Sequence, residues 1–250
     1  MEPKDGFVEA NGIRLHYTEW GGDAPPLVLL HATGFLARLW QPIAVQLSAR
    51  FHVYALDARG HGDSDKPAPS GGYGWEGLAA DLMGFLDSLG LVGVPIIGHS
   101  SGAAGAARLA AKRRMVWDSR EELITAYRQR RTFAGWRKDV LRLFAEHGTF
   151  EREDGRIELK CPGEIEAELY RNSLSPDTWD LLPHVGCPTL VIRGENTEPM
   201  LALVAEGVAR RIPGARLATI AGGSHFVPME RPEAIAAEAL AFLEGAVPVA

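Results

Sequence analysis

The stretch Pro95-Ile96-Ile97-Gly98-His99-Ser100-Ser101-Gly102-Ala103-Ala104 decides the fold of this chain. Its apolar run predicts a short buried strand, Gly-His-Ser-Ser-Gly predicts a sharp turn, and the Ala-rich sequence predicts a helix that ends in Lys112-Arg113-Arg114. A nucleophilic serine needs this context because the strained turn lifts its Oγ clear of the sheet, while small neighbours let the backbone pass. We expect Ser100 to be the nucleophile, since its rival Ser101 stands where the backbone N–H matters rather than the side chain.

Apolar runs alternate with helical patterns on both sides of this stretch. Such alternation predicts an α/β fold with a doubly wound, mostly parallel sheet. The first two strands, between Phe7 and Trp20, are expected to pair through a tight turn at Asn11-Gly12. The other strands of the sheet are expected at the apolar runs 27–30, 52–56, 95–97, 188–193 and 216–221.

His31, Asp57 and Ser100 each follow one of these predicted strands. Ligands of open parallel sheets bind beyond the carboxyl ends of the strands, so these three residues should meet at the same edge. The shared position of these three residues is independent support for the serine motif, whose pattern alone could occur by chance. The sequence therefore predicts a functional site at this edge.

Residues 113–186 break the alternation. A charged hairpin is expected around Asp154-Gly155, and helices are expected at 121–131, 136–147 and 162–170. We expect residues 1–112 and 187–250 to form the core, and residues 113–186 to form an inserted, mostly helical lid over the strand ends. The aromatic residues of this stretch are expected to pack as the core of the lid.

Composition bounds the partners and the location of the chain. Its 250 residues are 46% hydrophobic and 23% charged, as in an ordinary globular protein. A net charge of −6 argues against nucleic acid or an anionic membrane as partner, and no apolar run approaches the ~18 residues that span a bilayer. Residues 1–5 lack the features of a signal peptide, and Cys161 and Cys187 have no metal-ligand spacing around them. We expect a cytoplasmic protein with two free thiols, a small-molecule substrate and neither metal nor cofactor.

A serine hydroxyl becomes a useful nucleophile only when a neighbouring base takes its proton and a third group orients that base. His225 is the expected base because it lies in a glycine-rich turn after the last predicted strand. The orienting acid should follow the preceding strand, where Glu195 and Glu198 are both candidates. The resulting chain order of serine, acid and histidine is the one that this arrangement uses.

Two backbone N–H groups are expected to stabilise the oxyanion. One belongs to Ser101, and the other, from the loop after the third strand, is assigned to Thr33. His31 and Gly34 of the same loop are expected to support it. His99 should point into the fold beside the serine.

Four motifs together resemble the α/β-hydrolase fold family, specifically its small capped bacterial hydrolases. They are residues 98–102, 31–35, the run Asp57-Ala58-Arg59-Gly60-His61-Gly62-Asp63-Ser64, and Gly222-Gly223-Ser224-His225. The resemblance covers residues 7–112 and 187–245. It implies a Ser-acid-His triad. Glu198 stands at the position where relatives have the Asp of the triad, and Glu195 is not expected to belong to the triad.

Besides Glu198 in place of Asp, the chain departs from this family in a second respect. Relatives have a further core strand between the helix after the serine and the lid. Here no apolar strand is expected between Lys112 and Thr189, so we expect the sixth core strand to be missing. Such a gap leaves backbone groups unpaired unless the neighbouring strands close up.

The resemblance implies hydrolysis of a small, largely apolar carboxylic ester through an acyl-enzyme. Serine rather than Asp at position 100 argues against epoxide hydrolases and haloalkane dehalogenases, which form an alkyl ester on a carboxylate. Three alternatives stay open: a carbon–carbon bond hydrolase of diketone-like substrates, a slow-turnover ligand receptor, and a chain made inactive by the missing strand. The acyl and alcohol groups and the oligomeric state are not indicated.

Overall fold

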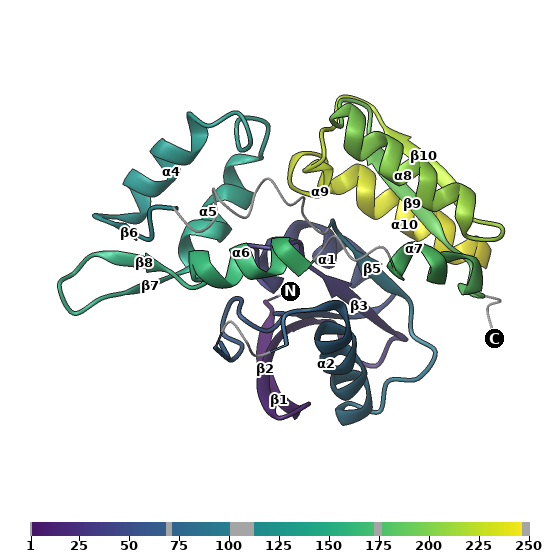
Figure 1. Ribbon diagram of the computed structural model, residues 1–250, viewed down its shortest axis with the longest axis horizontal. Helices are drawn as coiled ribbons and strands as arrows, with labels where there is room; N and C mark the ends of the chain where they lie inside the picture. Colours follow the sequence, from purple (N-terminus) through teal and green to yellow (C-terminus); the bar gives the residue numbers. More distant parts are fainter. Residues whose placement is uncertain (1, 69–71, 101–112, 173–176, 247–250) are drawn as a thin grey trace. The chain divides into compact units, whose positions relative to one another are not determined.

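Five strands form a mixed sheet in the N-terminal part of the computed structural model (Figure 1). The structure describes residues 2–68, 72–100, 113–172 and 177–246. The strand order is β1-β2-β4-β3-β5, in which β4, β3 and β5 run parallel and β2 pairs antiparallel with β1 and β4. The strands are β1 (Lys4–Ala10), β2 (Ile13–Trp20), β3 (Pro26–Leu30), β4 (His52–Leu56) and β5 (Ile96–Gly98).

The turn between β1 and β2 confirms the predicted hairpin. Asn11 and Gly12 have φ angles of 50° and 75°, and the paired strands bring Ala10 opposite Ile13. Two consecutive positive φ angles match the right-handed twist of a hairpin and explain the Asn-Gly sequence.

Buried side chains on both faces of the sheet show why the fold is doubly wound. Phe85 of helix α2 (Trp75–Ser88) packs in a cluster with Val28 of β3. Leu27 and Leu29 alternate with Val28, so they face the other side of the sheet, and both are fully buried. The helical segments η1 (Ala37–Trp40) and α1 (Gln41–Leu47) follow β3 and supply further buried apolar residues.

A second, antiparallel sheet lies in the middle of the chain, with the order β6-β8-β7. The expected hairpin around Asp154-Gly155 joins β7 and β8, but β6 is a two-residue strand that the sequence did not predict. Aromatic residues pack here as expected, with the rings of Tyr127 and Phe144 stacked at 5.6 Å. The elements are β6 (Val116–Trp117), α4 (Arg120–Arg128), α5 (Lys138–His147), β7 (Thr149–Glu151), β8 (Ile157–Leu159) and α6 (Gly163–Asn172).

The C-terminal part contains a pair of parallel strands with helices after each. The strand β9 pairs with β10 in a register that sets Leu190 beside Arg216. The elements are α7 (Asp177–Leu181), η2 (Leu182–His184), β9 (Leu190–Gly194), α8 (Pro199–Arg211), β10 (Arg216–Ile220), α9 (Val227–Glu230) and α10 (Pro232–Ala246).

The chain groups into two units, each described by itself below. Unit 1 comprises Met1–Ala134 and Lys138–Leu174, and unit 2 comprises Gly135–Arg137 and Ser175–Ala250. The Ala-rich helix expected after Ser100 falls within residues 101–112, outside the described residues. The missing sixth strand and the division into core and lid therefore stay predictions.

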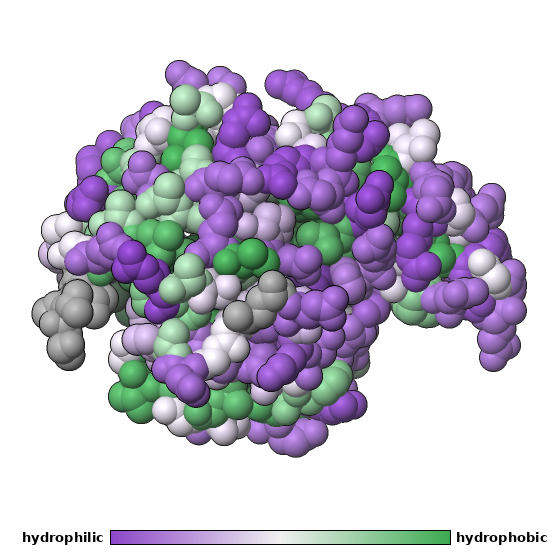
Figure 2. All heavy atoms as spheres, turned by 180° about the vertical axis from the view of Figure 1, so that it is seen from behind, coloured by the Kyte–Doolittle hydropathy of each residue, from purple (hydrophilic) through white to green (hydrophobic). Residues whose placement is uncertain are grey.

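On the face drawn in Figure 2, hydrophilic residues predominate and hydrophobic ones form small, scattered groups.

Both cysteines are free, Cys161 buried and Cys187 exposed. No helix in the described ranges combines the length and the apolar character needed to cross a bilayer.

Candidate active site

Ser100 has the backbone conformation that a nucleophile elbow requires. It follows the end of β5, where the His99 N–H donates to the Leu30 carbonyl at 3.1 Å. The φ of Ser100 is 52°, and only Asn11 shares a positive φ among the non-glycine residues that the structure describes. Strained conformations of this kind cluster at functional sites because the surrounding fold must enforce them. The Ser100 side chain lies at an exposed position.

The loop expected to hold the oxyanion forms a tight turn directly after β3. The Phe35 N–H donates to the Ala32 carbonyl at 3.0 Å, and Gly34 has a φ of 82°. Thr33, at the tip of this turn, is half-buried, and its N–H makes no hydrogen bond within the described ranges. This N–H can donate to a ligand. The other expected donor, Ser101, lies outside the described residues.

His61 fixes this loop from the neighbouring one. The Gly34 N–H donates to His61 Nε2 at 2.9 Å, and His61 Nδ1 lies 3.0 Å from the Arg59 carbonyl. An imidazole that accepts at Nε2 and donates from Nδ1 is neutral. Burial lowers the pKa of His61 to about 3, so the ring keeps this tautomer at neutral pH.

His31 makes the reciprocal contact. Its Nε2 accepts from the Ala58 N–H at 3.0 Å, and its Nδ1 lies 2.8 Å from the Ala32 carbonyl. Burial also lowers the pKa of His31. The rings of His31 and His61 meet edge-on, 4.9 Å apart. The two histidines therefore join the loops after β3 and β4.

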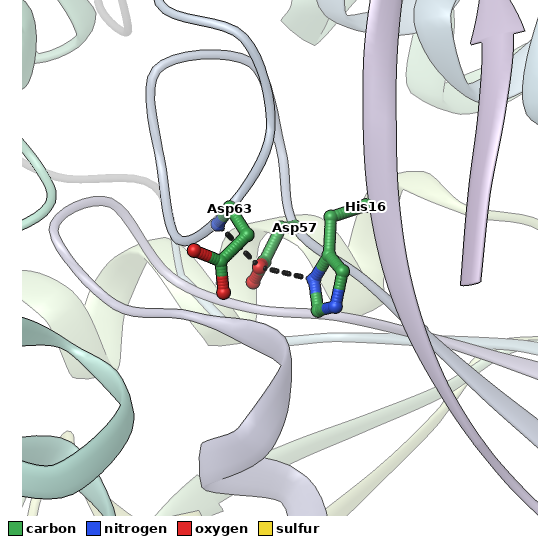
Figure 3. Close-up of side chains that lie close together, drawn as sticks. All are labelled: His16, Asp57 and Asp63. Carbon is green, nitrogen blue, oxygen red and sulfur yellow. Dashed lines mark hydrogen bonds and ion pairs between the residues drawn. The ribbon is translucent and has the colours of Figure 1, made fainter. Parts of the chain in front are cut away.

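Asp57, directly after β4, anchors three segments at once. Its Oδ1 accepts from the Ala37 N–H at 2.6 Å, and its Oδ2 accepts from the Asp63 N–H at 3.0 Å. His16 Nδ1 lies 2.7 Å from the same Oδ2 (Figure 3). Burial alone would raise the pKa of Asp57, but its hydrogen bonds, above all the one to His16, bring it far below the ordinary value. Asp57 is an ionised structural anchor.

His16, Asp57 and Asp63 also offer ligand atoms within 4.8 Å of one another, a spacing compatible with a metal ion. The hydrogen bonds argue against that role, since both oxygens of Asp57 already accept from donors. Burial lowers the pKa of His16, but Asp57 and Asp5 outweigh it and raise this pKa overall. A metal needs a neutral imidazole. We therefore interpret the group as a hydrogen-bond network.

His225 and the two candidate acids lie together in unit 2. His225 is half-buried, and burial lowers its pKa, while the charge of Glu198 acts in the opposite direction. Glu198 is exposed and occupies the N-cap position of α8, where its side chain makes no capping hydrogen bond. Glu195 has a different partner, because its Oε2 accepts from the Gly222 N–H at 2.9 Å. The charge of Glu198 thus acts on His225, whereas Glu195 holds the turn through its hydrogen bond with Gly222.

Sequence reasoning missed one residue of this region, the buried Glu230 at the end of α9. The available signal was an acidic residue directly after the run Phe226–Met229, which contains apolar side chains only. The structure gives Glu230 two hydrogen bonds from Ser224, beside His225.

Comparison with known proteins identifies the family. The model of the alpha/beta hydrolase family matches residues 27–238. N-formylmaleamate deformylase of Pseudomonas putida is 41% identical over 107 residues, 43% of this chain and 40% of the deformylase. 2-(Acetamidomethylene)succinate hydrolase of Mesorhizobium japonicum is 27% identical over 258 residues, 90% of each chain. Epoxide hydrolase A of Mycobacterium tuberculosis is 39% identical over 104 residues, 40% of this chain and 32% of that enzyme.

Solved structures agree on the fold. The crystal structure of E-2-(acetamidomethylene)succinate hydrolase superposes with a TM-score of 0.83 at 22% identity, covering 97% of this chain and 100% of the other. The enol-lactonase from Burkholderia xenovorans gives a TM-score of 0.74 at 24% identity, with coverage of 96% and 100%. Most of the similar proteins are named as hydrolases, and one, from Streptomyces lividans, is named as a non-heme chloroperoxidase. This chain belongs to the alpha/beta hydrolase family.

Proposed function

We propose that this chain is a serine hydrolase that cleaves a small, largely apolar carboxylic ester through an acyl-enzyme. Ser100 is the nucleophile, His225 the general base and Glu198 the acid that orients it. The observation that carries the proposal is the φ of 52° at Ser100, directly after a parallel strand. A serine adopts this strained conformation at a cost, and the cost is explained if the turn presents Oγ to a substrate.

In the proposed reaction, Ser100 Oγ attacks the ester carbonyl while His225 takes the hydroxyl proton. The N–H groups of Thr33 and Ser101 stabilise the oxyanion of the tetrahedral intermediate. His225 then gives its proton to the leaving alcohol, and an acyl group remains on Ser100. Water repeats the sequence with His225 as base, which releases the acid and restores the serine.

The electrostatics around His225 suit this role. Because burial lowers its pKa, the imidazole is neutral at pH 7 and can accept a proton. The carboxylate of Glu198 favours the imidazolium that forms during the reaction. Activity should therefore be lost as the pH falls through the pKa of His225.

Hydrolysis of a small N-acyl amide is a second candidate. It is favoured by the names of two relatives, N-formylmaleamate deformylase and 2-(acetamidomethylene)succinate hydrolase. The same triad could also cleave a carbon–carbon bond of a diketone-like substrate. Epoxide opening is disfavoured, although epoxide hydrolases are among the relatives, because Ser100 replaces the carboxylate that would form the alkyl ester.

Labelling with a fluorophosphonate, followed by peptide mass spectrometry, tests the proposal. An adduct on Ser100 is expected, and Ser100→Ala should lose it together with turnover, by a factor on the order of 10⁶. Ser101→Ala is the matched control and should keep the adduct, since only its backbone N–H is used. A folded protein that stays unlabelled would contradict the proposal and favour the receptor or the inactive chain.

A substrate panel then separates the candidate reactions. We expect p-nitrophenyl esters with short acyl chains to be turned over faster than N-formyl or N-acetyl amides and β-diketones. Faster turnover of the amides would move the assignment to an amidohydrolase, and faster turnover of the diketones would move it to a carbon–carbon hydrolase.

A further inference from the structure

One buried carboxylate, that of Glu230, is bonded twice to Ser224, the residue before His225. The Ser224 N–H donates to Glu230 Oε2 at 2.6 Å, and the Ser224 hydroxyl donates to Glu230 Oε1 at 2.7 Å. The same hydroxyl oxygen accepts from the Phe226 N–H at 3.1 Å. The backbone before and after His225 is thus tied, through one hydroxyl, to one carboxylate.

A segment from far upstream in the chain closes over this carboxylate. Gly135 approaches so closely that a Cβ there would lie 2.5 Å from Glu230 Oε1. Two residues on, the Arg137 N–H donates to the Met229 carbonyl at 3.1 Å. Only 8% of Glu230 is exposed as a result. Burying a carboxylate is costly unless hydrogen bonds compensate, and the bonds that compensate here come from the neighbour of His225.

We infer that Glu230 is a positioning residue, which sets the backbone of the histidine turn so that the imidazole of His225 keeps the orientation that proton transfer needs. This inference rests on the proposed role of His225 as general base. The turn is irregular, so its geometry depends on such side-chain acceptors as well as on backbone bonds such as the one from the Val227 N–H to the Ser224 carbonyl at 3.1 Å. A displacement of about 1 Å at a reacting group can cost on the order of 10²-fold in rate.

Glu230→Gln is the first test because it keeps the size of the side chain. The amide oxygen can accept from only one of the two Ser224 donors, and the other donor then faces an NH₂ group. We expect kcat for a p-nitrophenyl ester to fall on the order of 10- to 100-fold, while KM changes less than about threefold. Glu233→Gln is the matched control: this exposed glutamate pairs with Arg137, and its loss should leave kcat unchanged.

Two further variants disturb the hydrogen bonds between Ser224 and Glu230 without replacing Glu230. Gly135→Ala leaves the carboxylate intact but pushes on Oε1, so it should reproduce the kcat loss with KM retained. Ser224→Ala removes the hydroxyl that links Glu230 to Phe226 but keeps the backbone donor, and it should give a smaller loss. These variants keep the inference testable if Glu230→Gln does not fold.

All rates are measured well below the melting temperature of each variant, with His225→Ala as the reference for a lost base. If Glu230→Gln and Gly135→Ala lower only the melting temperature and keep the wild-type kcat, Glu230 is structural and the inference is overturned. If His225→Ala is as active as the wild type, the proposed function itself fails, and the inference fails with it. A kcat loss in Glu230→Gln beside an inactive His225→Ala supports both.

Discussion

The loop after β3 (residues 31–35), which we propose holds the oxyanion and call the oxyanion loop, and the turn around His225 (residues 222–226), the histidine turn, are both irregular segments. Different chemistry holds each of them in place. In the loop after β3, neutral imidazole nitrogens accept from backbone N–H groups, as His61 does from Gly34. In the turn after β10, carboxylates do so, with Glu195 bonded to Gly222 and Glu230 to Ser224. Backbone donors outside regular structure need acceptors in either case, but the two kinds of acceptor respond differently to acid and to substitution.

The difference has a simple consequence for each region. A neutral imidazole accepts only while it stays unprotonated, so the loop depends on the burial that lowers the pKa of His61 and His31. A carboxylate accepts with two oxygens, so one side chain such as Glu230 can take several donors. Substitutions in the two regions should therefore fail in different ways.

The largest effect is expected where the two glutamates of the histidine turn are compared. Glu198→Gln should lower kcat about 10⁴-fold, as the loss of an orienting acid does, because Gln supplies no charge to favour the imidazolium. Glu195→Gln should lower it less than about tenfold, since its carboxylate braces Gly222. Steady-state kinetics of both variants measure these losses. A larger loss of kcat in Glu195→Gln than in Glu198→Gln would show that Glu195 is the orienting acid.

The next largest effect is expected at the anchor of the oxyanion loop. Asp57→Asn should reduce the free energy of unfolding by about 3–5 kcal/mol, because it leaves the buried His16 without the carboxylate that raises its pKa. Asp5→Asn is the control: it also pairs with His16, but from an exposed position, and should cost less than about 1 kcal/mol. Urea unfolding measures both, and equal losses would show that Asp57 is no anchor.

A smaller loss is expected when the imidazole acceptor is removed. His61→Ala leaves the buried Gly34 N–H without its partner, which should cost about 1–3 kcal/mol and slow acylation by the fluorophosphonate. His184→Ala, at an exposed position in η2, should change stability by less than about 0.5 kcal/mol. If His61→Ala is as stable as the wild type, His61 does not hold this loop in place.

A further effect concerns pH. The pKa of His61 is about 3 in the folded chain and about 6.5 when unfolded, so the unfolded chain binds the extra proton between these values. The stability contributed by neutral His61 is complete above pH ~6.5 and is lost as the pH falls towards 3. Between pH 4 and 6, His61→Ala should show a slope of unfolding free energy smaller by at most about 1.4 kcal/mol per pH unit. Identical slopes would contradict the burial argument.

Local patterns predicted much of this molecule. The Asn-Gly turn, the strands that flank it and the strained Ser100 follow from short-range chemistry, and the structure confirms the hairpin and the alternating fold. The strand Val116–Trp117 was missed because two residues carry no periodicity, and its partner β8 lies some 40 positions away. Glu230 was missed for a similar reason, since its burial depends on Gly135, distant in sequence. What local sequence cannot predict here are contacts made by single residues across long separations.

The placement of residues Gly135–Arg137 with unit 2 also bears on how this protein can be engineered. The segment lies between α4 and α5, in a part of the chain that a designer would choose for shortening or for exchange with a relative. Removing it would strip the cover from Glu230 and expose the underside of the histidine turn to water. Chimeras that swap this region should therefore retain the tripeptide and its junctions, because the swap would otherwise alter the reaction as well as the substrate range.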